Sequence, residues 1–256
     1  MAQKVSIITV CFNSEKTIRD TIESVLSQDY PNIEYIVIDG KSSDRTMSII
    51  QEYGDRIAIA ISEPDKGIYD AMNKGIYRAS GEVIGMLNSD DIYMDTHAVS
   101  ELIGKMELEQ TDSVFSDLVI VDSHDLFKVL RYYDSGSFSP WKFRFGWMPA
   151  HPTFFVKKSL YDAVGSYSLD YQISADYEML IRILWVKKAS YSYLPKPMVR
   201  MRHGGASTSG FDRNWVLNKE IVKACRDNGI WTNIFVVLLK FPQKLMEKIL
   251  ARRRWN

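Results

Sequence analysis

The chain has 256 residues, of which 46% are hydrophobic and 25% are charged, so it can bury a full core and has no composition typical of disordered or fibrous proteins. Lysine plus arginine and aspartate plus glutamate each number 32, which excludes the overall positive field that holds nucleic acid. Cys11 and Cys225 lack the spacing of a metal knuckle, and the chain has no secretory signature, which favours a cytoplasmic protein.

The first ninety residues alternate short apolar runs, polar loops and segments of helical period, which predicts a largely parallel sheet. The predicted strands are residues 5–10, 35–38, 57–61 and 83–87. Helices are expected from about Ile18 to Gln28, from about Thr46, and over residues 68–79. Because neighbouring strands would run the same way, we expect their carboxyl ends to share one edge.

Beyond Asp95 the alternation loosens. The pattern predicts a helix over residues 96–108, strands over 113–116 and 118–121, and a helix over 177–185. An aromatic stretch at residues 138–147 fits either the wall of an acceptor pocket or ordinary core packing.

The segment from Asn214 onward is predicted to be helical, and its residues 230–239 are strongly apolar. Six basic residues follow this apolar stretch: Lys240, Lys244, Lys248, Arg252, Arg253 and Arg254. An apolar face beside a basic face suits the surface of an anionic membrane, which we favour as a partner. A helix that packs on the domain and leaves its lysines in water gives much the same pattern.

Candidate chemistry lies in the loops that follow the four predicted strands, because ligands of open α/β sheets bind beyond the carboxyl ends of the strands. These loops are residues 9–13, 39–44, 63–67 and 88–91, and three of them contribute carboxylates. Converging carboxylates repel each other unless a cation or a donor-rich ligand lies among them, which indicates a bound metal or such a ligand. Each acidic pair also fits a turn that caps the next helix.

Taken in order, these loops resemble the donor half of the family-two inverting glycosyltransferases. The resemblance continues in residues 150–155, in residues 174–178 and in His203-Gly204-Gly205, and it spans roughly residues 4–210. Within the family the chain is most similar to bacterial enzymes of cell-surface polysaccharide synthesis, of the colanic acid, exopolysaccharide or O-antigen type.

The resemblance implies an α/β fold of the GT-A type, with three α/β/α layers around a mainly parallel sheet and a C-terminal helical extension. It also divides the chain into a nucleotide-sugar-binding half at residues 1–95, an acceptor-binding half at residues 96–213, and the extension at residues 214–256, which is the segment expected to contact membrane.

The resemblance assigns roles to individual residues. Those expected to bind the donor are Thr9, Cys11, Asn13, Asp39, Asp65, Lys66 and Asp90. The family's Asp-x-Asp metal motif begins here with Ser89, so Asp91 is the expected direct ligand of Mn²⁺ or Mg²⁺, and His203 is the candidate third ligand of metal or phosphate.

Asp176 matches the position of the family's general base, which takes a proton from the acceptor hydroxyl. An acidic residue in the first turn of a helix also has a purely structural use, because it interacts favourably with the helix dipole. His151 fits either the acceptor side of the site or a hydrogen-bonded crevice position.

The implied function is metal-dependent transfer of a sugar, with inversion, from a UDP-sugar to a saccharide or polyprenyl-linked acceptor at the cytoplasmic face of a bacterial membrane. A sugar-phosphate nucleotidylyltransferase is the enzymatic alternative, but no glycine-rich phosphate loop follows the first strand. A non-catalytic nucleotide-sugar-binding subunit of a polysaccharide assembly is the other alternative.

Overall fold

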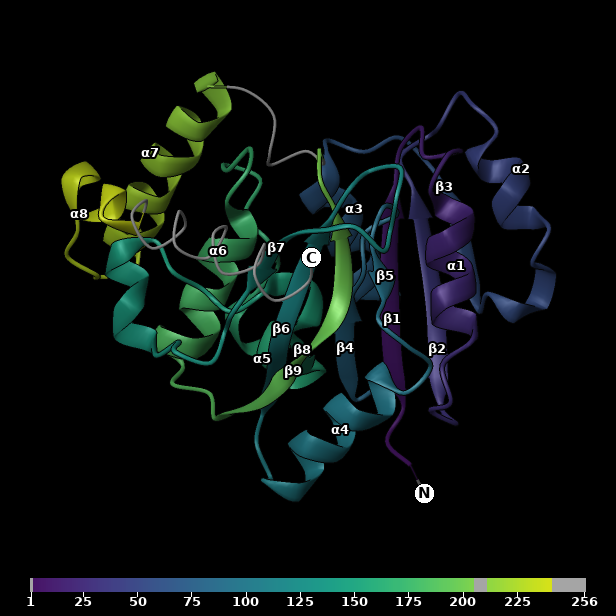
Figure 1. Ribbon diagram of the computed structural model, residues 1–256, viewed down its shortest axis with the longest axis horizontal. Helices are drawn as coiled ribbons and strands as arrows, with labels where there is room; N and C mark the ends of the chain where they lie inside the picture. Colours follow the sequence, from purple (N-terminus) through teal and green to yellow (C-terminus); the bar gives the residue numbers. More distant parts are fainter. Residues whose placement is uncertain (1, 205–210, 241–256) are drawn as a thin grey trace.

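The computed structural model describes residues 2–204 and 211–240. Its central element is one mixed sheet (Figure 1). Within these residues the strand order is β3 (Ile59–Ser62), β2 (Ile33–Asp39), β1 (Val5–Cys11), β4 (Val83–Met86), β8 (Phe155–Lys157), β6 (Ser113–Val121), β9 (Tyr191–Arg202) and β5 (Ile92–Tyr93), and β7 (Val129–Tyr133) pairs with β6.

The first four strands confirm the parallel arrangement expected from the sequence. β1 runs parallel to both β2 and β4, and β2 runs parallel to β3. The register places Cys11 beside Asp39 and Asp39 beside Ser62, so the carboxyl ends of these strands meet at one edge. That edge is where the candidate loops begin.

The second half of the sheet is mixed. β8 is antiparallel to β4 and β6, β5 is antiparallel to β9, and β6 is parallel to β9. Residues 113–121 form one strand instead of the two expected, because the carboxylate of Asp117 between them is satisfied inside the protein. It accepts hydrogen bonds from the Ser135 amide and from the hydroxyls of Tyr132 and Tyr193, and the register with β9 shifts at this residue.

Helices cover both faces of the sheet (Figure 1). They are α1 (Ile18–Leu26), α2 (Thr46–Gln51), α3 (Ile68–Arg78), α4 (Ala98–Leu108), α5 (Lys158–Val164), α6 (Ala175–Leu180), α7 (Phe211–Asp227) and α8 (Ile234–Leu238), with a π-helical turn, η4 (Ile181–Val186), extending α6. Short 3₁₀ turns are η1 (Gly54–Arg56), η2 (Pro140–Phe145) and η3 (His151–Thr153). Side chains of a strand point alternately to its two faces, so Ile7 packs in the cluster with Ile22 of α1 while Ile8 packs in the cluster with Met72 of α3.

The described part of the C-terminal segment, up to Lys240, packs on the domain. α7 begins at Phe211, ahead of the expected start at Asn214, and buries Ile221, Ala224 and Cys225 in the same cluster as α3 and α6. Lys240 is buried, so the expectation that it belongs to an exposed basic face, whether at a membrane or in water, is wrong. The other five residues of that expected face, Lys244, Lys248, Arg252, Arg253 and Arg254, lie outside the described residues. In the part of the chain that the structure describes, no helix combines the length and apolar character needed to cross a bilayer.

Candidate active site

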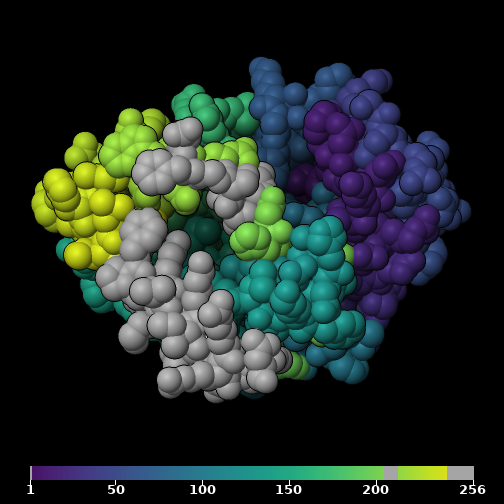
Figure 2. All heavy atoms as spheres, turned by 45° about the horizontal axis from the view of Figure 1, so that its top comes forward, coloured from purple at the N-terminus to yellow at the C-terminus, as the bar shows by residue number. Residues whose placement is uncertain are grey.

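A cavity of about 890 Å³ opens at the carboxyl edge of the parallel strands. Its lining combines the loops after β1, β2, β3 and β4 with the segment that enters α6, the end of β9 and the start of α7. Figure 2 shows the purple N-terminal segments and the yellow-green α7 on opposite sides of this face of the molecule. The cavity therefore joins the two halves of the chain that the sequence pattern distinguished.

Four of the expected donor-binding residues line this cavity: Cys11, Asn13, Asp65 and Asp90. Asn13 has a positive φ of 49°, and its side-chain oxygen accepts a hydrogen bond of 2.9 Å from the amide of Ser43. This bond ties the loop after β1 to the loop after β2, which fixes the shape of that side of the cavity.

Asp39 lies beneath the cavity rather than in its lining, next to Gly40, which does line it. Its carboxylate is fully buried and accepts hydrogen bonds from the amide and hydroxyl of Ser42 and from the hydroxyl of Ser62. The thiol of Cys11 lies 3.6 Å from the same carboxylate, and burial, followed by the charge of Asp39, raises the pKa of that thiol. Cys11 therefore stays a neutral thiol in the cavity wall.

Gly40 and Asp65 approach each other so closely that a side chain at position 40 would require the Asp65 carboxylate to move. A Cβ atom on Gly40 would lie 2.3 Å from Oδ2 of Asp65. The other oxygen of Asp65 accepts a hydrogen bond of 2.8 Å from the amide of Gly67, whose φ of 113° suits only glycine well. Asp65 is thus held in place from both sides.

Two residues expected to contact the donor, Thr9 and Lys66, are absent from the described lining of the cavity. Thr9 is fully buried, and its hydroxyl accepts a hydrogen bond of 3.1 Å from Tyr35, so its side chain belongs to the core. Lys66 is exposed, and its backbone amide bonds to Asp70. Among the described residues neither side chain belongs to the cavity lining.

Asp91 is the most unusual side chain at the site. It is 1% exposed and lines the cavity, and its Oδ1 accepts no hydrogen bond from any residue that the structure describes. Burial and then the neighbouring charge of Asp90 raise the pKa of Asp91 well above its ordinary value. Burial also raises the pKa of Asp90. A buried carboxylate with an unsatisfied oxygen calls for a positive partner.

Arg202, at the end of β9, is a cavity residue that the sequence did not reveal. Its Nη1 donates a hydrogen bond of 3.0 Å to the carbonyl oxygen of Asp90, and its Nη2 forms an ion pair with Asp20. The guanidinium thus places a fixed positive charge beside the acidic pair, where it lowers the pKa of both carboxyls against the effect of burial.

His203 follows Arg202 directly but is exposed, and its backbone amide bonds to the carbonyl oxygen of Val121. The described part of the cavity lining reaches Arg202 and does not include His203. Within residues 2–204 and 211–240, no three histidine, cysteine, aspartate or glutamate side chains converge to hold a metal by themselves. Gly205 lies outside the described residues.

Asp176 is the second residue of α6 and lines the same cavity as Asp91. Its Oδ1 accepts a hydrogen bond of 2.8 Å from the amide of Tyr177 and lies 3.4 Å from the Tyr69 hydroxyl, while its Oδ2 accepts no hydrogen bond from the described residues. Burial raises the pKa of Asp176, and the nearby imidazole of His151 opposes that shift. The geometry leaves one carboxylate oxygen available to a ligand.

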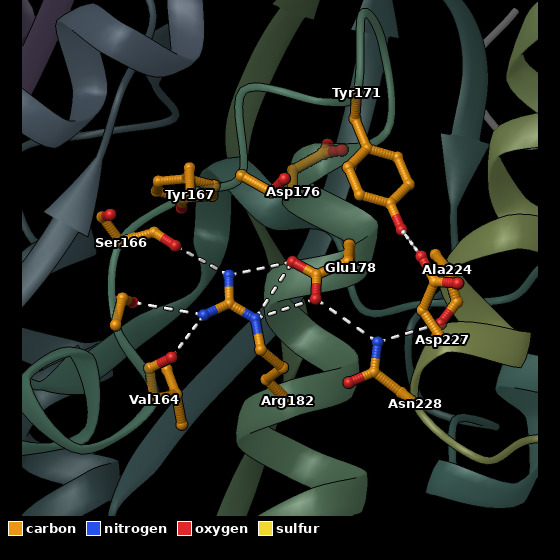
Figure 3. Close-up of polar contacts among 12 residues, drawn as sticks. Val164, Ser166, Tyr167, Tyr171, Asp176, Glu178, Arg182, Ala224, Asp227 and Asn228 are labelled. Carbon is orange, nitrogen blue, oxygen red and sulfur yellow. Dashed lines mark hydrogen bonds and ion pairs between the residues drawn. The ribbon is translucent and has the colours of Figure 1, made fainter.

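Glu178, the second acid of this turn, is occupied by structural contacts. It forms an ion pair of 2.8 Å with Arg182, whose guanidinium also donates to the carbonyl oxygens of Val164 and Ser166 (Figure 3). Asn228 donates to Glu178 from the end of α7. Glu178 therefore ties α6 to its neighbours, and Asp176 is the acid of this pair that lines the cavity.

His151 lines the cavity as well and is largely buried. Its Nε2 lies 2.9 Å from the hydroxyl of Tyr167, which in turn lies 3.2 Å from the hydroxyl of Tyr161. Burial lowers the pKa of His151, so the ring is a neutral, hydrogen-bonded part of the wall.

The family model described as Glycosyl transferase family 2 matches residues 6–165, which include the loops after β1 to β4. The chain belongs to glycosyl transferase family 2. Among curated proteins, an uncharacterized glycosyltransferase of Mycobacterium tuberculosis is 35% identical over 183 residues, covering 71% of this chain and 69% of that protein. A putative teichuronic acid biosynthesis glycosyltransferase of Bacillus subtilis is 37% identical over 106 residues, covering 40% of this chain and 42% of that protein.

Solved structures confirm the GT-A fold of this glycosyltransferase. A mannosyltransferase from Pyrobaculum calidifontis in complex with GDP-Man and Mn²⁺ has a TM-score of 0.66 at 18% identity, covering 98% of this chain and 74% of that chain. S. aureus TarS 1-349 in complex with UDP-GlcNAc has a TM-score of 0.65 at 18% identity, with the same coverage of 98% and 74%. Membership of the family removes the nucleotidylyltransferase alternative.

Proposed function

We propose that the enzyme transfers a sugar, with inversion, from a nucleotide-diphosphate donor to an acceptor hydroxyl, with Asp176 as general base and a divalent cation bound at Asp91. The observation that carries this proposal is that Asp91 and Asp176, 85 positions apart in the sequence, line one cavity at the carboxyl edge of the sheet.

The residues present fit a cation that is shared with the donor. Mg²⁺ is commonly bound by one or two carboxylates together with substrate phosphates, so a full set of protein ligands is not required. Asp91 offers a buried carboxylate whose Oδ1 lacks a partner among the described residues, and Asp90 lies beside it. A bound Mn²⁺ or Mg²⁺ would stabilise the negative charge that develops on the leaving diphosphate. Arg202 would supply positive charge to the same region.

Asp176 suits the role of base for two reasons. One of its oxygens is held by the Tyr177 amide, which orients the carboxylate, and the other is not engaged by the described residues. Its raised pKa makes the ionised form a stronger proton acceptor, since a base works best when its pKa approaches the working pH. Attack by the acceptor oxygen from the face opposite the diphosphate would invert the anomeric centre.

For the donor we propose a UDP-sugar, bound by the loops that present Cys11, Asn13 and Asp65, with Asp39 supporting them from below. UDP-GlcNAc in the TarS complex and GDP-Man in the mannosyltransferase complex support a nucleotide sugar. For the acceptor we propose a saccharide or polyprenyl-linked intermediate of a surface polysaccharide, which the similarity to the Bacillus protein supports.

We also propose that the C-terminal segment contacts the inner face of a membrane. Trp231, Phe235 and Leu239 are spaced four residues apart around α8 and are 69%, 77% and 63% exposed. Five further basic residues follow in the sequence between Lys244 and Arg254. Apolar side chains that enter the headgroup region next to a basic segment bind anionic bilayers.

A thermal-shift screen tests the donor and the cation together. A nucleotide sugar that binds the folded state raises the melting temperature, and we expect a UDP-sugar to do so more strongly with Mn²⁺ than without it. Asp176→Asn should then lower transfer by a factor of about 10² to 10⁴ and leave the donor-induced shift intact. Full transfer activity in this variant would remove Asp176 from the mechanism. If neither the variant nor the wild-type protein transferred any sugar, the alternative of a binding subunit would be revived instead.

A further inference from the structure

Glu220 on α7 binds the backbone of the segment that carries Asp176. Its Oε1 accepts a hydrogen bond of 2.7 Å from the amide of Gln172, and its Oε2 accepts bonds of 3.0 and 2.9 Å from the amides of Ile173 and Ser174. The side chain is largely buried, at 9% exposure. One carboxylate therefore satisfies three consecutive backbone donors.

These donors need a partner from elsewhere in the fold. Ser174 is the N-cap residue of α6, but its own hydroxyl makes no hydrogen bond to any described residue. The amides of Gln172 and Ile173 lie ahead of α6, and the Ser174 amide belongs to its N-cap residue, so the helix provides no partner for them. Glu220 supplies that partner from α7, and it adds a negative charge beside the positive end of the α6 dipole.

The segment held in this way also forms part of the cavity. Gln172, Ile173 and Asp176 all line it, and Asp176 lies two residues after the last amide that Glu220 binds. The hydroxyl of Tyr69 on α3 donates to the carbonyl oxygen of Ile173. Residues 172–176 are thus fixed between α7 on one side and α3 on the other.

Two further residues of α7, Lys223 and Asp227, also contact the segment that leads to Asp176. The Tyr171 hydroxyl donates a bond of 2.9 Å to Asp227, and Nζ of Lys223 lies 4.1 Å from the centre of the Tyr171 ring (Figure 3 shows the Tyr171–Asp227 bond). Lys223 and Asp227 are themselves paired at 2.9 Å. α7 therefore contacts the segment that leads to Asp176 at two places, at Tyr171 and at residues 172–174.

We propose that Glu220 is a positioning residue, which holds the Asp176 carboxylate at the acceptor side of the cavity through the backbone of residues 172–174. This inference rests on the proposed role of Asp176 as the base. A buried carboxylate is costly to desolvate, and among the described residues that cost is offset by hydrogen bonds from the three amides of this one segment. The Glu220 side chain therefore fixes the positions of the amides of residues 172–174.

The test compares Glu220→Gln with Asp176→Asn and with Arg226→Gln, an exposed substitution on the same helix. In Glu220→Gln one carboxylate oxygen becomes an NH₂ group, which cannot accept a hydrogen bond from the backbone amides of residues 172–174. We expect kcat to fall by about tenfold to a hundredfold while the KM for the donor changes less than about twofold, because displacement of the base affects the transition state and not donor binding.

A second readout does not depend on transfer. Amide hydrogen exchange over residues 172–176 should become faster in Glu220→Gln and stay unchanged in Arg226→Gln. If Glu220→Gln does not fold, Glu220→Asp, which keeps the charge but withdraws it by one methylene, takes its place with the same expectation.

The outcomes separate the two proposals. Full activity of Asp176→Asn would refute the base and leave the exchange result to report on the Glu220 contact alone. Loss of activity in Asp176→Asn together with wild-type kcat in the Glu220 variant, whether or not exchange became faster, would overturn the positioning role. A rise in donor KM that matches the fall in kcat would overturn it as well.

Discussion

The hydroxyl of Tyr69 on α3 contacts Ile173 and Asp176 together: it donates a hydrogen bond to the carbonyl oxygen of Ile173 and lies 3.4 Å from Oδ1 of Asp176. α3 follows the Asp65 loop, so this single side chain links the proposed donor-binding half to the proposed base. The ring also stacks on Tyr167 with a centroid separation of 5.8 Å.

Tyr69→Phe should therefore impair catalysis more than folding, since the phenyl ring keeps the stacking contact. The Tyr69 hydroxyl lowers the pKa of Asp176 against the effect of burial, so its removal should raise that pKa further. Activity that requires ionised Asp176 is lost as the pH falls through this pKa, and the acid limb of kcat/KM should move to higher pH in the variant. A pH–rate profile measures the shift. Tyr77→Phe, an exposed tyrosine on the same helix, is the control, and identical profiles for wild type and Tyr69→Phe would contradict the prediction.

Asp91→Asn should stabilise the nucleotide-free protein at neutral pH. Burial, followed by the charge of Asp90, raises the pKa of Asp91 in the folded protein above its value in the unfolded chain. Between these two pKa values the folded protein holds a proton that the unfolded chain has released, so the free energy of unfolding falls as the pH rises through this interval. Asparagine carries no charge and escapes this loss. For a chain of this size about 1 kcal/mol corresponds to roughly 2–4 °C in melting temperature.

The same substitution should abolish the extra thermal stabilisation that Mn²⁺ gives in the presence of a nucleotide sugar. Asp55→Asn, an exposed change in η1, should alter neither quantity. A lower melting temperature for nucleotide-free Asp91→Asn at pH 7 would contradict the predicted stabilisation, and an undiminished Mn²⁺ effect would argue against a cation at this carboxylate.

Glu34 on β2 should govern part of the acid stability. Burial raises the pKa of its carboxyl, but hydrogen bonds from Lys4, Ser6 and Ser80 outweigh burial and lower that pKa to about 2. A depressed carboxyl pKa contributes stability that is present above the unfolded value and is lost as the pH falls toward 2. Glu34→Gln should cost on the order of 2–3 kcal/mol at pH 7, and the difference from wild type should shrink in acid.

Urea unfolding at pH 7 and at pH 3 measures this effect. Glu52→Gln, which breaks the exposed pair with Arg19, should change stability much less at either pH. An equal loss for Glu34→Gln at both values would show that the carboxylate charge is not responsible.

Membrane binding should depend on the exposed apolar row of α8. A deletion after Asn228 would also remove the buried side chains of Ile230 and Val237, so substitution is the cleaner experiment. Trp231→Ser combined with Phe235→Ser should reduce co-sedimentation with vesicles of anionic phospholipid by about tenfold or more and leave donor binding unchanged. Tyr77→Ser, which removes an 88% exposed aromatic ring elsewhere, serves as the control. Equal binding by all three proteins would discard the membrane proposal.

The sequence predicted the first half of the fold well, for a physical reason. Strands buried on both faces, such as β1 and β2, are almost continuously apolar, and parallel pairing brings their following loops to one edge. The later strands carry a weaker signal: β5 has two residues, and β9 contains Pro195 and Pro197. Asp117 divided β6 into two apparent strands because its tyrosine partners could not be inferred from local pattern.

The candidate site likewise contains residues that could be predicted from the sequence and residues that could not. Cys11 ends β1, and Asn13, Asp65, Asp90 and Asp91 lie in the loops that follow β1, β3 and β4, so their convergence could be predicted from topology. Arg202 could not, because its partners Asp90 and Asp20 lie 112 and 182 positions away in the sequence. Glu220 is similar, since the amides that it binds lie 46 to 48 positions before it. Such pairings depend on how distant elements pack, which periodicity does not encode.

The contact between Gly40 and Asp65 also limits how this site can change during evolution. A larger residue at position 40 would need the carboxylate at position 65 to withdraw, and a withdrawn carboxylate would release the turn at Gly67. Substitutions at these three positions are therefore coupled, so a relative that replaces Gly40 should also differ at the position of Asp65 or in the turn at Gly67.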